Sequence, residues 1–179
     1  MATLGLDFIS KDVSPSSKPD ETYNLKIWDT AGQERFKSLT MTFYKQSQGM
    51  MICFDVTKQS TFQAVKRWIV AVNNNCERGV ATLLIGNKCD LTDERVVSQE
   101  EAEALAADNN MQYFETSARS NINVQEPFEA IIDQVYKNKF ATGEPAEAES
   151  RGTIKLGRKS DARAAAQQDE KKKKGGCCK

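Results

Sequence analysis

Three short apolar runs, separated by stretches of helical period, constrain the fold of this chain most strongly. They are residues 49–56 (GMMICFDV), 81–87 (ATLLIGN) and 111–116 (MQYFET). Their nearly continuous apolar character is typical of parallel strands that are covered on both faces. Strands that alternate with helices in this way predict an α/β domain with a mostly parallel sheet.

The stretches around these runs predict one helix and one hairpin. Residues 8–27 contain two polar–apolar segments around a loop rich in Pro and Ser, which is typical of a hairpin whose second strand, residues 23–29, ends at Asp29. Residues 60–75 repeat apolar side chains at helical spacing, and the predicted buried face carries Phe62, Val65, Ile69 and Val72.

Two further helices are predicted from their first residues. Residues 98–110 begin with Ser98, and Glu101 follows at the spacing of a capping box. Residues 123–138 begin with Asn123 and Glu126 at the same spacing. We therefore expect Ser98 and Asn123 to cap their helices.

The composition divides the chain into two parts. Residues 1–140 predict one folded domain, whereas residues 141–179 hold ten basic and six acidic residues and almost no bulky apolar side chain. Such a segment cannot offset the entropy of folding, so we expect a disordered tail. The whole chain has 25 basic and 25 acidic residues, and this balance predicts no nucleic-acid partner.

The apolar content also bears on the compartment. No window approaches the roughly 18 apolar residues of a membrane-spanning helix, and no secretory signal opens the sequence. We therefore expect a cytosolic chain with reduced cysteines. Cys53 and Cys89 lie in apolar or strand-end contexts, and we interpret them as packing residues.

Polar residues follow the ends of successive strands: Asp29, then Asn87, Lys88 and Asp90, then Ser117 and Ala118. In an open parallel sheet, ligands bind beyond the carboxyl ends of the strands. A rigid carboxylate at Asp90 could accept hydrogen bonds from adjacent N–H and NH₂ groups, which guanine offers and adenine does not. A site with a buried acid rejects a base that leaves this acid unpaired, as adenine would. The motif therefore disfavours an ATPase or a kinase.

Together these motifs resemble the Rab family of small GTPases, in the Ras superfamily. The resemblance rests on TLGLDF, NLKIWDTAGQERFKSLT, MICFDVT, GNKCDL and ETSA, and on two cysteines near the C-terminus. It covers residues 3 to about 140 together with the last few residues. It implies a P-loop NTPase-like three-layer sandwich and a molecular switch that binds GTP and GDP with Mg²⁺ and hydrolyses GTP.

The resemblance also implies roles for individual residues. Thr3 and Asp29 hold Mg²⁺, Thr30, Ala31 and Gly32 lie at the phosphates, and Gln33 is the catalytic residue that orients the attacking water. The loop residues Asn87, Lys88, Asp90, Ser117 and Ala118 hold the guanine. The surface that effectors read in the GTP state comprises Leu6, Phe8, Trp28, Phe36 and Tyr44, with Leu39 as a further candidate. For Phe8 and Trp28, ordinary core packing remains an equal alternative.

One part of the family pattern is not found before residue 29. The P-loop pattern G-x-x-x-x-G-K-[ST] is missing, and with it the family's first strand and first helix. A near match, GTIKLGRKS at residues 152–160, displaces the lysine by one position and follows no predicted strand.

In the family, the first strand lies between the strands formed here by residues 23–29 and 49–55, so we expect these two to lack their shared partner. The fold is therefore predicted to be incomplete at the N-terminus, from a truncated gene model, isoform or fragment. The alternative function is a lipid-anchored remnant that binds partners without nucleotide.

The last residues, KKKKGGCCK, predict an attachment to membranes. Such pairs are geranylgeranylated in the Rab family, so the resemblance implies lipidation of Cys177 and Cys178. Two lipid chains with four lysines anchor a protein firmly to an anionic leaflet. The resemblance to the Rab family further implies that the protein cycles between the cytosol and the cytoplasmic face of endomembranes or the plasma membrane. The implied partners are effectors, exchange factors, GTPase-activating proteins, prenylation escort and GDP-dissociation inhibitor proteins, in vesicle-mediated membrane traffic and protein transport.

Overall fold

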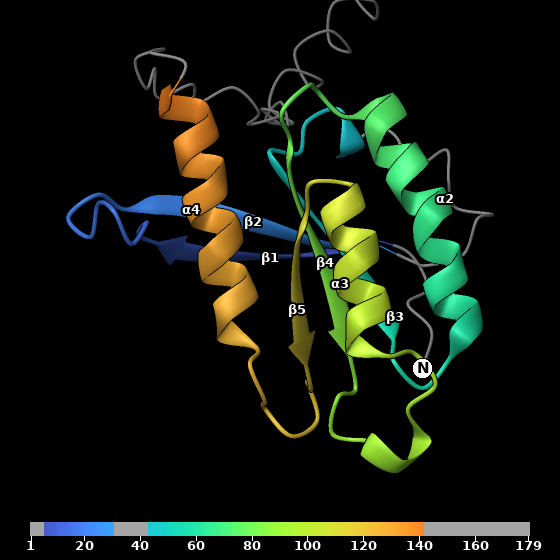
Figure 1. The fold of residues 1–179 in the computed structure, drawn as a ribbon. Coiled ribbons are helices and arrows are strands. Elements are labelled where there is room, and N and C mark those ends of the chain that lie inside the picture. The colour runs from blue at the N-terminus through green and yellow to red at the C-terminus, as the bar shows by residue number, and fades with distance from the viewer. Residues whose placement is uncertain (1–5, 31–42, 142–179) are drawn as a thin grey trace, which may run out of the picture. The chain divides into compact units, whose positions relative to one another are not determined.

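The computed structural model describes residues 6–30 and 43–141 (Figure 1). The strands are β1 (Leu6–Val13), β2 (Tyr23–Thr30), β3 (Gly49–Asp55), β4 (Ala81–Asn87) and β5 (Gln112–Thr116). The helices are α2 (Gln59–Asn75), the 3₁₀ turn η2 (Thr92–Glu94), α3 (Gln99–Asp108) and α4 (Gln125–Ala141). The chain divides into units of residues 1–145 and 146–179, and the second lies outside the described residues, so the predicted tail from residue 141 stays a prediction.

The strands form two separate ladders. Strands β3, β4 and β5 are parallel and lie in that order, which confirms the predicted parallel sheet. Strands β1 and β2 form the predicted antiparallel hairpin, in a register that runs from Leu6 opposite Thr30 to Val13 opposite Tyr23. Within the described residues no ladder joins β2 to β3, which is the arrangement expected for two strands that lack a shared partner.

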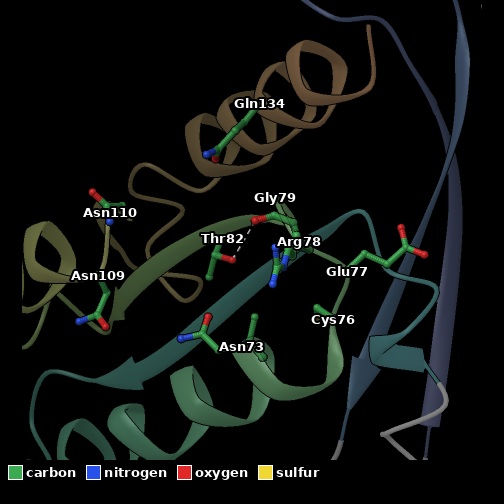
Figure 2. Close-up of a pocket in the computed structure, with 11 residues that line it drawn as sticks. Asn73, Cys76, Glu77, Arg78, Gly79, Thr82, Asn109, Asn110 and Gln134 are labelled. Carbon is green, nitrogen blue, oxygen red and sulfur yellow. Dashed lines mark hydrogen bonds between the residues drawn. The ribbon is translucent and has the colours of Figure 1, made fainter. Parts of the chain in front are cut away.

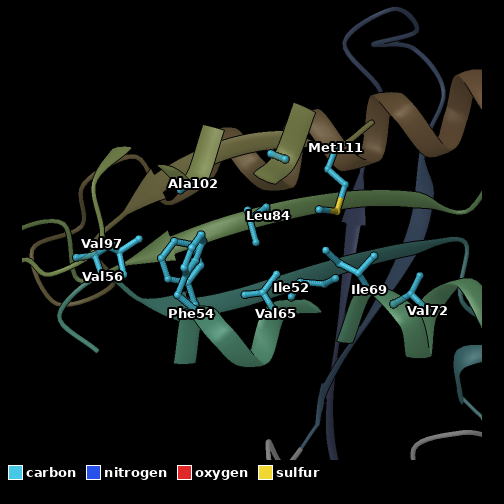
Figure 3. Close-up of a cluster of buried hydrophobic side chains, with 12 residues drawn as sticks. Ile52, Phe54, Val56, Val65, Ile69, Val72, Leu84, Val97, Ala102 and Met111 are labelled. Atoms are coloured by element: carbon cyan, nitrogen blue, oxygen red, sulfur yellow. The ribbon is translucent and has the colours of Figure 1, made fainter. Parts of the chain in front are cut away.

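Helices cover both faces of the parallel sheet, because successive residues of a strand point to opposite faces. Helices α2 and α3 pack on the face that carries Ile52, Phe54 and Leu84 (Figure 3). Helix α4 packs through Ile131 on the opposite face, over Ala81, Leu83 and Ile85. The predicted buried face of α2 is confirmed, since all four of its apolar residues lie in the core: Phe62, Val65, Ile69 and Val72. The fold is thus an α/β sandwich of three layers, consistent with a small G-protein.

Only one of the two predicted helix caps forms. The Ser98 hydroxyl accepts a hydrogen bond from the Glu101 amide at 3.1 Å, as predicted. The prediction for Asn123 is wrong, because α4 begins at Gln125 and Asn123 has a φ of 51°. Its side-chain amide instead donates to the Glu115 carbonyl at the end of β5, at 2.9 Å. A contact across the fold has replaced the local cap.

The cysteines are less buried than expected. Cys53 is exposed, so the prediction that it is a packing residue is wrong, whereas Cys89 is half-buried. Cys53 lies two residues beyond Met51 on the same face of β3, and α4 covers Met51 there but leaves Cys53 exposed. No helix in the described part of the chain is long and apolar enough to cross a bilayer.

Candidate functional site

The carboxyl ends of the three parallel strands meet at one edge of the sheet. Asp55, Asn87 and Thr116 are the last residues of β3, β4 and β5, and the register places Asn87 opposite both of the others. Beyond them, Ser117 is fully buried and Ala118 is exposed. The sheet therefore brings the predicted loops after β4 and β5 side by side.

Asn87 joins these two loops through its side-chain oxygen. Its Oδ1 accepts hydrogen bonds from the Lys88 amide at 2.7 Å and from the Ala118 amide at 3.4 Å. The backbone adds a second link, because the Cys89 amide donates to the Thr116 carbonyl at 3.0 Å. As expected from its place at the strand end, Asn87 holds the loop after β4 against the loop after β5.

Lys88 bonds to the end of the neighbouring strand. It has a φ of 66°, and its ammonium donates to Oδ2 of Asp55 at 2.5 Å. The other carboxylate oxygen, Oδ1, accepts hydrogen bonds from the Thr57 amide and hydroxyl. Burial alone raises the pKa of Asp55, but the hydrogen bonds from Lys88 and Thr57 outweigh it and hold the pKa below its usual value. Asp55 therefore fixes the direction of the lysine side chain.

Asp90 lies beside a cavity between the two loops. A hydrogen bond from the buried Ser117 hydroxyl is the main cause that lowers the pKa of Asp90, so the carboxylate is charged near neutral pH. The cavity has a volume of about 320 Å³, which lies within the range of small-molecule sites. Its lining residues come from the end of β4 and from the two loops: Asn87, Lys88, Asp90, Leu91, Ser117, Ala118 and Arg119. A carboxylate, a lysine stem and a backbone amide thus surround a space that can hold a flat polar ring.

Comparison with known proteins decides the family. The Ras family model matches residues 1–137. The chain belongs to the Ras family. It is similar to Ras-related protein RABA5b of Arabidopsis thaliana, with 42% identity over 137 residues, or 76% of this chain and 62% of that protein. It is similar to GTP-binding protein Rab-3D of Rattus norvegicus, with 38% identity over 148 residues, or 83% of this chain and 66% of that protein.

A third relative is matched over a larger share of its own length. Ras-related protein RabG2 of Dictyostelium discoideum is 39% identical over 140 residues, which are 77% of this chain and 71% of that protein. These relatives place the chain in the Rab branch of the Ras family. The chain spans less than two thirds of the length of RABA5b and of Rab-3D.

The predicted phosphate and metal residues of this Rab-branch chain are described only in part. Asp29 and Thr30 end β2, and Asp29 is exposed. Thr3, Ala31, Gly32, Gln33, Cys177 and Cys178 lie outside the described residues. No group of three or more His, Cys, Asp or Glu side chains that could hold a metal occurs in residues 6–30 and 43–141. Asp29 is an oxygen ligand of the kind that Mg²⁺ prefers, and of the two predicted ligands it alone is described.

The predicted effector surface of the Rab-branch chain needs one correction. Phe8 and Trp28 are 53% and 38% exposed, so the surface interpretation is favoured over core packing for both. Tyr44 is only 6% exposed and therefore does not belong to this surface. Its neighbour Phe43, which the sequence prediction missed, packs on the Trp28 ring at a centroid distance of 4.6 Å. Leu6 lies in β1 on the same hairpin, whereas Phe36 and Leu39 are outside the described residues.

A second cavity, of about 360 Å³, lies at the opposite edge of the sheet (Figure 2). Its lining includes Thr82 near the start of β4, and Asn109 and Asn110, which precede β5. The Gln134 side-chain oxygen is buried beside it with no hydrogen-bond partner in the described structure. None of the predicted site residues lines this cavity, so it is separate from the loops that meet beyond Asn87.

Two residues near the site escaped the sequence analysis. Arg95 and Glu115 form an ion pair with an Nη2–Oε2 distance of 2.7 Å, between the segment after Asp90 and the end of β5. Glu115 belongs to the ETSA motif, but Arg95 precedes it by 20 residues in the sequence. No local spacing connects residues so far apart, and only the parallel pairing of β4 with β5 brings them together.

Proposed function

We propose that this chain contains the guanine-reading part of a Rab-type switch, which binds GTP and GDP and hydrolyses GTP during vesicle-mediated membrane traffic. The observation that carries the proposal is the position of Asp90 in the cavity between the two loops, where Ser117 holds it. Membership of the Rab branch supports the same function.

The chemistry of the cavity favours guanine. A fixed carboxylate accepts two hydrogen bonds from the N1–H and 2-amino groups of this base, and the Ala118 amide can donate to its O6 atom. The Lys88 stem covers one face of the ring while its ammonium stays with Asp55. Adenine has an acceptor at N1, so its ring would set an acceptor against the Asp90 carboxylate and displace water from it without forming either hydrogen bond, which is costly for a charged group.

Hydrolysis depends on the residues that the family resemblance assigns to the phosphates. Asp29 and Thr3 would hold Mg²⁺, which neutralises negative charge on the β- and γ-phosphate oxygens when it is bound. Gln33 would orient the attacking water, and the Gly32 amide would contact the γ-phosphate. The exposed position of Asp29 at the end of β2 is compatible with this role.

Partner binding is proposed for the aromatic cluster of Phe8, Trp28 and Phe43. These rings pack in series, with centroids 4.8 Å apart for Phe8 and Trp28, and yet Phe8 and Trp28 keep a large exposed area. Exposed aromatic side chains are enriched in the centres of protein interfaces. We propose that effectors and regulators contact this cluster, and that lipids on Cys177 and Cys178 attach the chain to membranes.

A titration with fluorescent GDP and Mg²⁺ tests the nucleotide proposal on the full chain. We expect saturable binding with micromolar or tighter affinity, and loss of most of this affinity in Asp90→Ala. Asp93→Ala, an exposed aspartate in η2, is the matched control and should bind as the wild type does. Absence of binding by the wild type would defeat nucleotide switching for this chain and favour the remnant that binds partners only.

A further inference from the structure

Arg95 and Glu115 form a two-point ion pair next to the candidate site. Nη1 of Arg95 donates to Oε1 of Glu115, and Nη2 donates to Oε2, both at 2.7 Å. The two side chains are only 25% and 20% exposed. A planar guanidinium that bonds to both oxygens of a carboxylate fixes their relative orientation, which a single-point lysine contact does not.

Further hydrogen bonds hold both partners in place. The Tyr113 hydroxyl donates to Oε1 of Glu115 at 2.8 Å, and the Asn123 side chain donates to the Glu115 carbonyl at 2.9 Å. Nη1 of Arg95 also donates to the Val97 carbonyl at 3.2 Å. The Val97 amide in turn donates to the carbonyl of Val56, just after β3, at 3.1 Å. The ion pair thus belongs to a connected network that reaches β3 and β5.

The ion pair joins the segments that flank the two loops, but it does not line their cavity. Arg95 follows Asp90 by five residues, and Glu115 precedes Ser117 by two residues. The loops also contact each other directly, through the 3.4 Å Asn87–Ala118 hydrogen bond and the hydrogen bond from Ser117 to Asp90. The Arg95–Glu115 pair adds to these contacts a two-point charged link between the segments that flank the loops.

We propose that the Arg95–Glu115 pair is a positioning device that holds Asp90 and Ala118 at the separation at which both can bond one guanine ring, and that it thereby sets selectivity for guanine over hypoxanthine. The proposal rests on the proposed function. Hypoxanthine lacks the 2-amino group, so it forms one hydrogen bond fewer with Asp90. If Asp90 is displaced, it no longer accepts a hydrogen bond from the 2-amino group of guanine. The ratio of the affinities for GDP and IDP then falls.

The first test needs no nucleotide. Amide hydrogen exchange is measured on the full-length wild type, Arg95→Gln, Arg95→Lys, and the charge-reversed Arg95→Glu/Glu115→Arg. We expect amides of residues 88–91 and 117–120 to exchange roughly tenfold faster in Arg95→Gln, as for loss of a charged hydrogen bond, with an intermediate value for Arg95→Lys. Partial recovery in the charge-reversed variant supports a pairwise action. Amides of the β3–β4 ladder should keep their exchange rates.

A matched arginine controls for charge. Arg67→Gln removes an exposed arginine on α2 and should leave the exchange of both loops unchanged. If Arg95→Gln fails to fold, Arg95→Lys and the charge-reversed variant decide the matter by the same comparison. Equal loop exchange in the wild type and every folded variant would overturn the positioning role.

The second test measures base selectivity as the ratio of the Kd values for IDP and GDP. A merely structural role lowers both affinities together and keeps this ratio, whereas positioning predicts a ratio several-fold smaller in Arg95→Gln. An unchanged ratio with weaker binding of both nucleotides would contradict the proposal. If the wild type binds neither nucleotide, the proposed function fails for this chain, and the exchange experiment alone judges whether the pair fixes the loops.

Discussion

The indole ring of Trp28 packs against the phenyl ring of Phe43, with their centroids 4.6 Å apart and their planes inclined by 44°. Phe8 packs on the same indole ring at 4.8 Å. The cluster therefore joins the β1–β2 hairpin to the segment that leads into β3, although no ladder joins β2 to β3 within the described residues.

Removal of the Phe43 ring should expose Trp28 and loosen this junction. In a Trp68→Phe background, where Trp28 is the remaining tryptophan, we expect Phe43→Ala to shift the fluorescence emission to longer wavelength. The free energy of unfolding should fall by about 1 kcal/mol beyond the loss of buried area, as is typical of an aromatic pair. Phe43→Tyr keeps the ring and should leave the emission unchanged. An unchanged emission in Phe43→Ala would contradict the packing.

The hairpin loop also contacts α4. The Ser16 amide donates to Oδ1 of Asp133 at 2.7 Å, the neighbouring Pro15 is fully buried, and the Tyr23 ring meets the Tyr136 ring edge-on at 6.0 Å. We expect Asp133→Ala to lower the free energy of unfolding by about 1–2 kcal/mol, because the acceptor is lost. Asp133→Asn keeps an acceptor and should cost less. Asp108→Ala, an exposed residue at the end of α3, is the control in urea unfolding.

Gly86 in β4 is required by the Tyr113 hydroxyl. A Cβ at this position would lie 2.5 Å from that oxygen, and 3.1 and 3.2 Å from side-chain atoms of Val56 and Phe54. We expect Gly86→Ala to destabilise the fold by about 1–3 kcal/mol, as overpacked cores do. In a double-mutant cycle with Tyr113→Phe, which removes the hydroxyl, the cost of Gly86→Ala should fall. An additive cycle would mean that Tyr113 does not determine the need for glycine.

The Glu115 carboxylate should make stability depend on pH. The hydrogen bond from Arg95 is the main cause that holds the pKa of Glu115 below its usual value, although burial opposes it and Tyr113 adds to it. A lowered pKa in the folded state gives stability that is present above the unfolded pKa of about 4.3 and is lost as the pH falls through the folded value. We expect the urea midpoint of the wild type to exceed that of Glu115→Gln near neutral pH, and the difference to shrink below about pH 4. A constant difference across this range would contradict the ion pair.

The sequence predicted those helices, strands and caps that are determined by residues close together in the chain. The buried face of α2 follows from apolar residues at helical spacing, and the three parallel strands follow from their apolar runs. The cap at Ser98 depends on residues within one turn and also formed as predicted. Asn123 has the same local pattern, but its amide bonds to Glu115 across the fold, and no pattern within one turn reveals that competition.

The candidate site was predictable where a motif ends a strand and was missed where contacts are distant. Asn87, Lys88 and Asp90 follow β4 directly, so the loop position was evident from the sequence. Lys88 bonds to Asp55, 33 residues earlier, and that partner has no sequence signal. Phe43 and Tyr44 are adjacent aromatic residues, and only the packing of the domain decides that Phe43 meets Trp28 while Tyr44 is buried. The roles of Thr3, Gln33 and the terminal cysteines stay predictions.

The central claim is that the loops after β4 and β5 select guanine through Asp90, and competition binding tests it most directly. Fluorescent GDP bound to the full chain with Mg²⁺ is displaced by unlabelled GDP or ADP, in the wild type and in Asp90→Ala. We predict that ADP is at least about 1,000-fold weaker than GDP in the wild type, since a site built to bond a polar group rejects the analogue that cannot pair. This preference should largely disappear in Asp90→Ala. Equal displacement by ADP and GDP in the wild type, or an undiminished preference in the variant, would contradict the account.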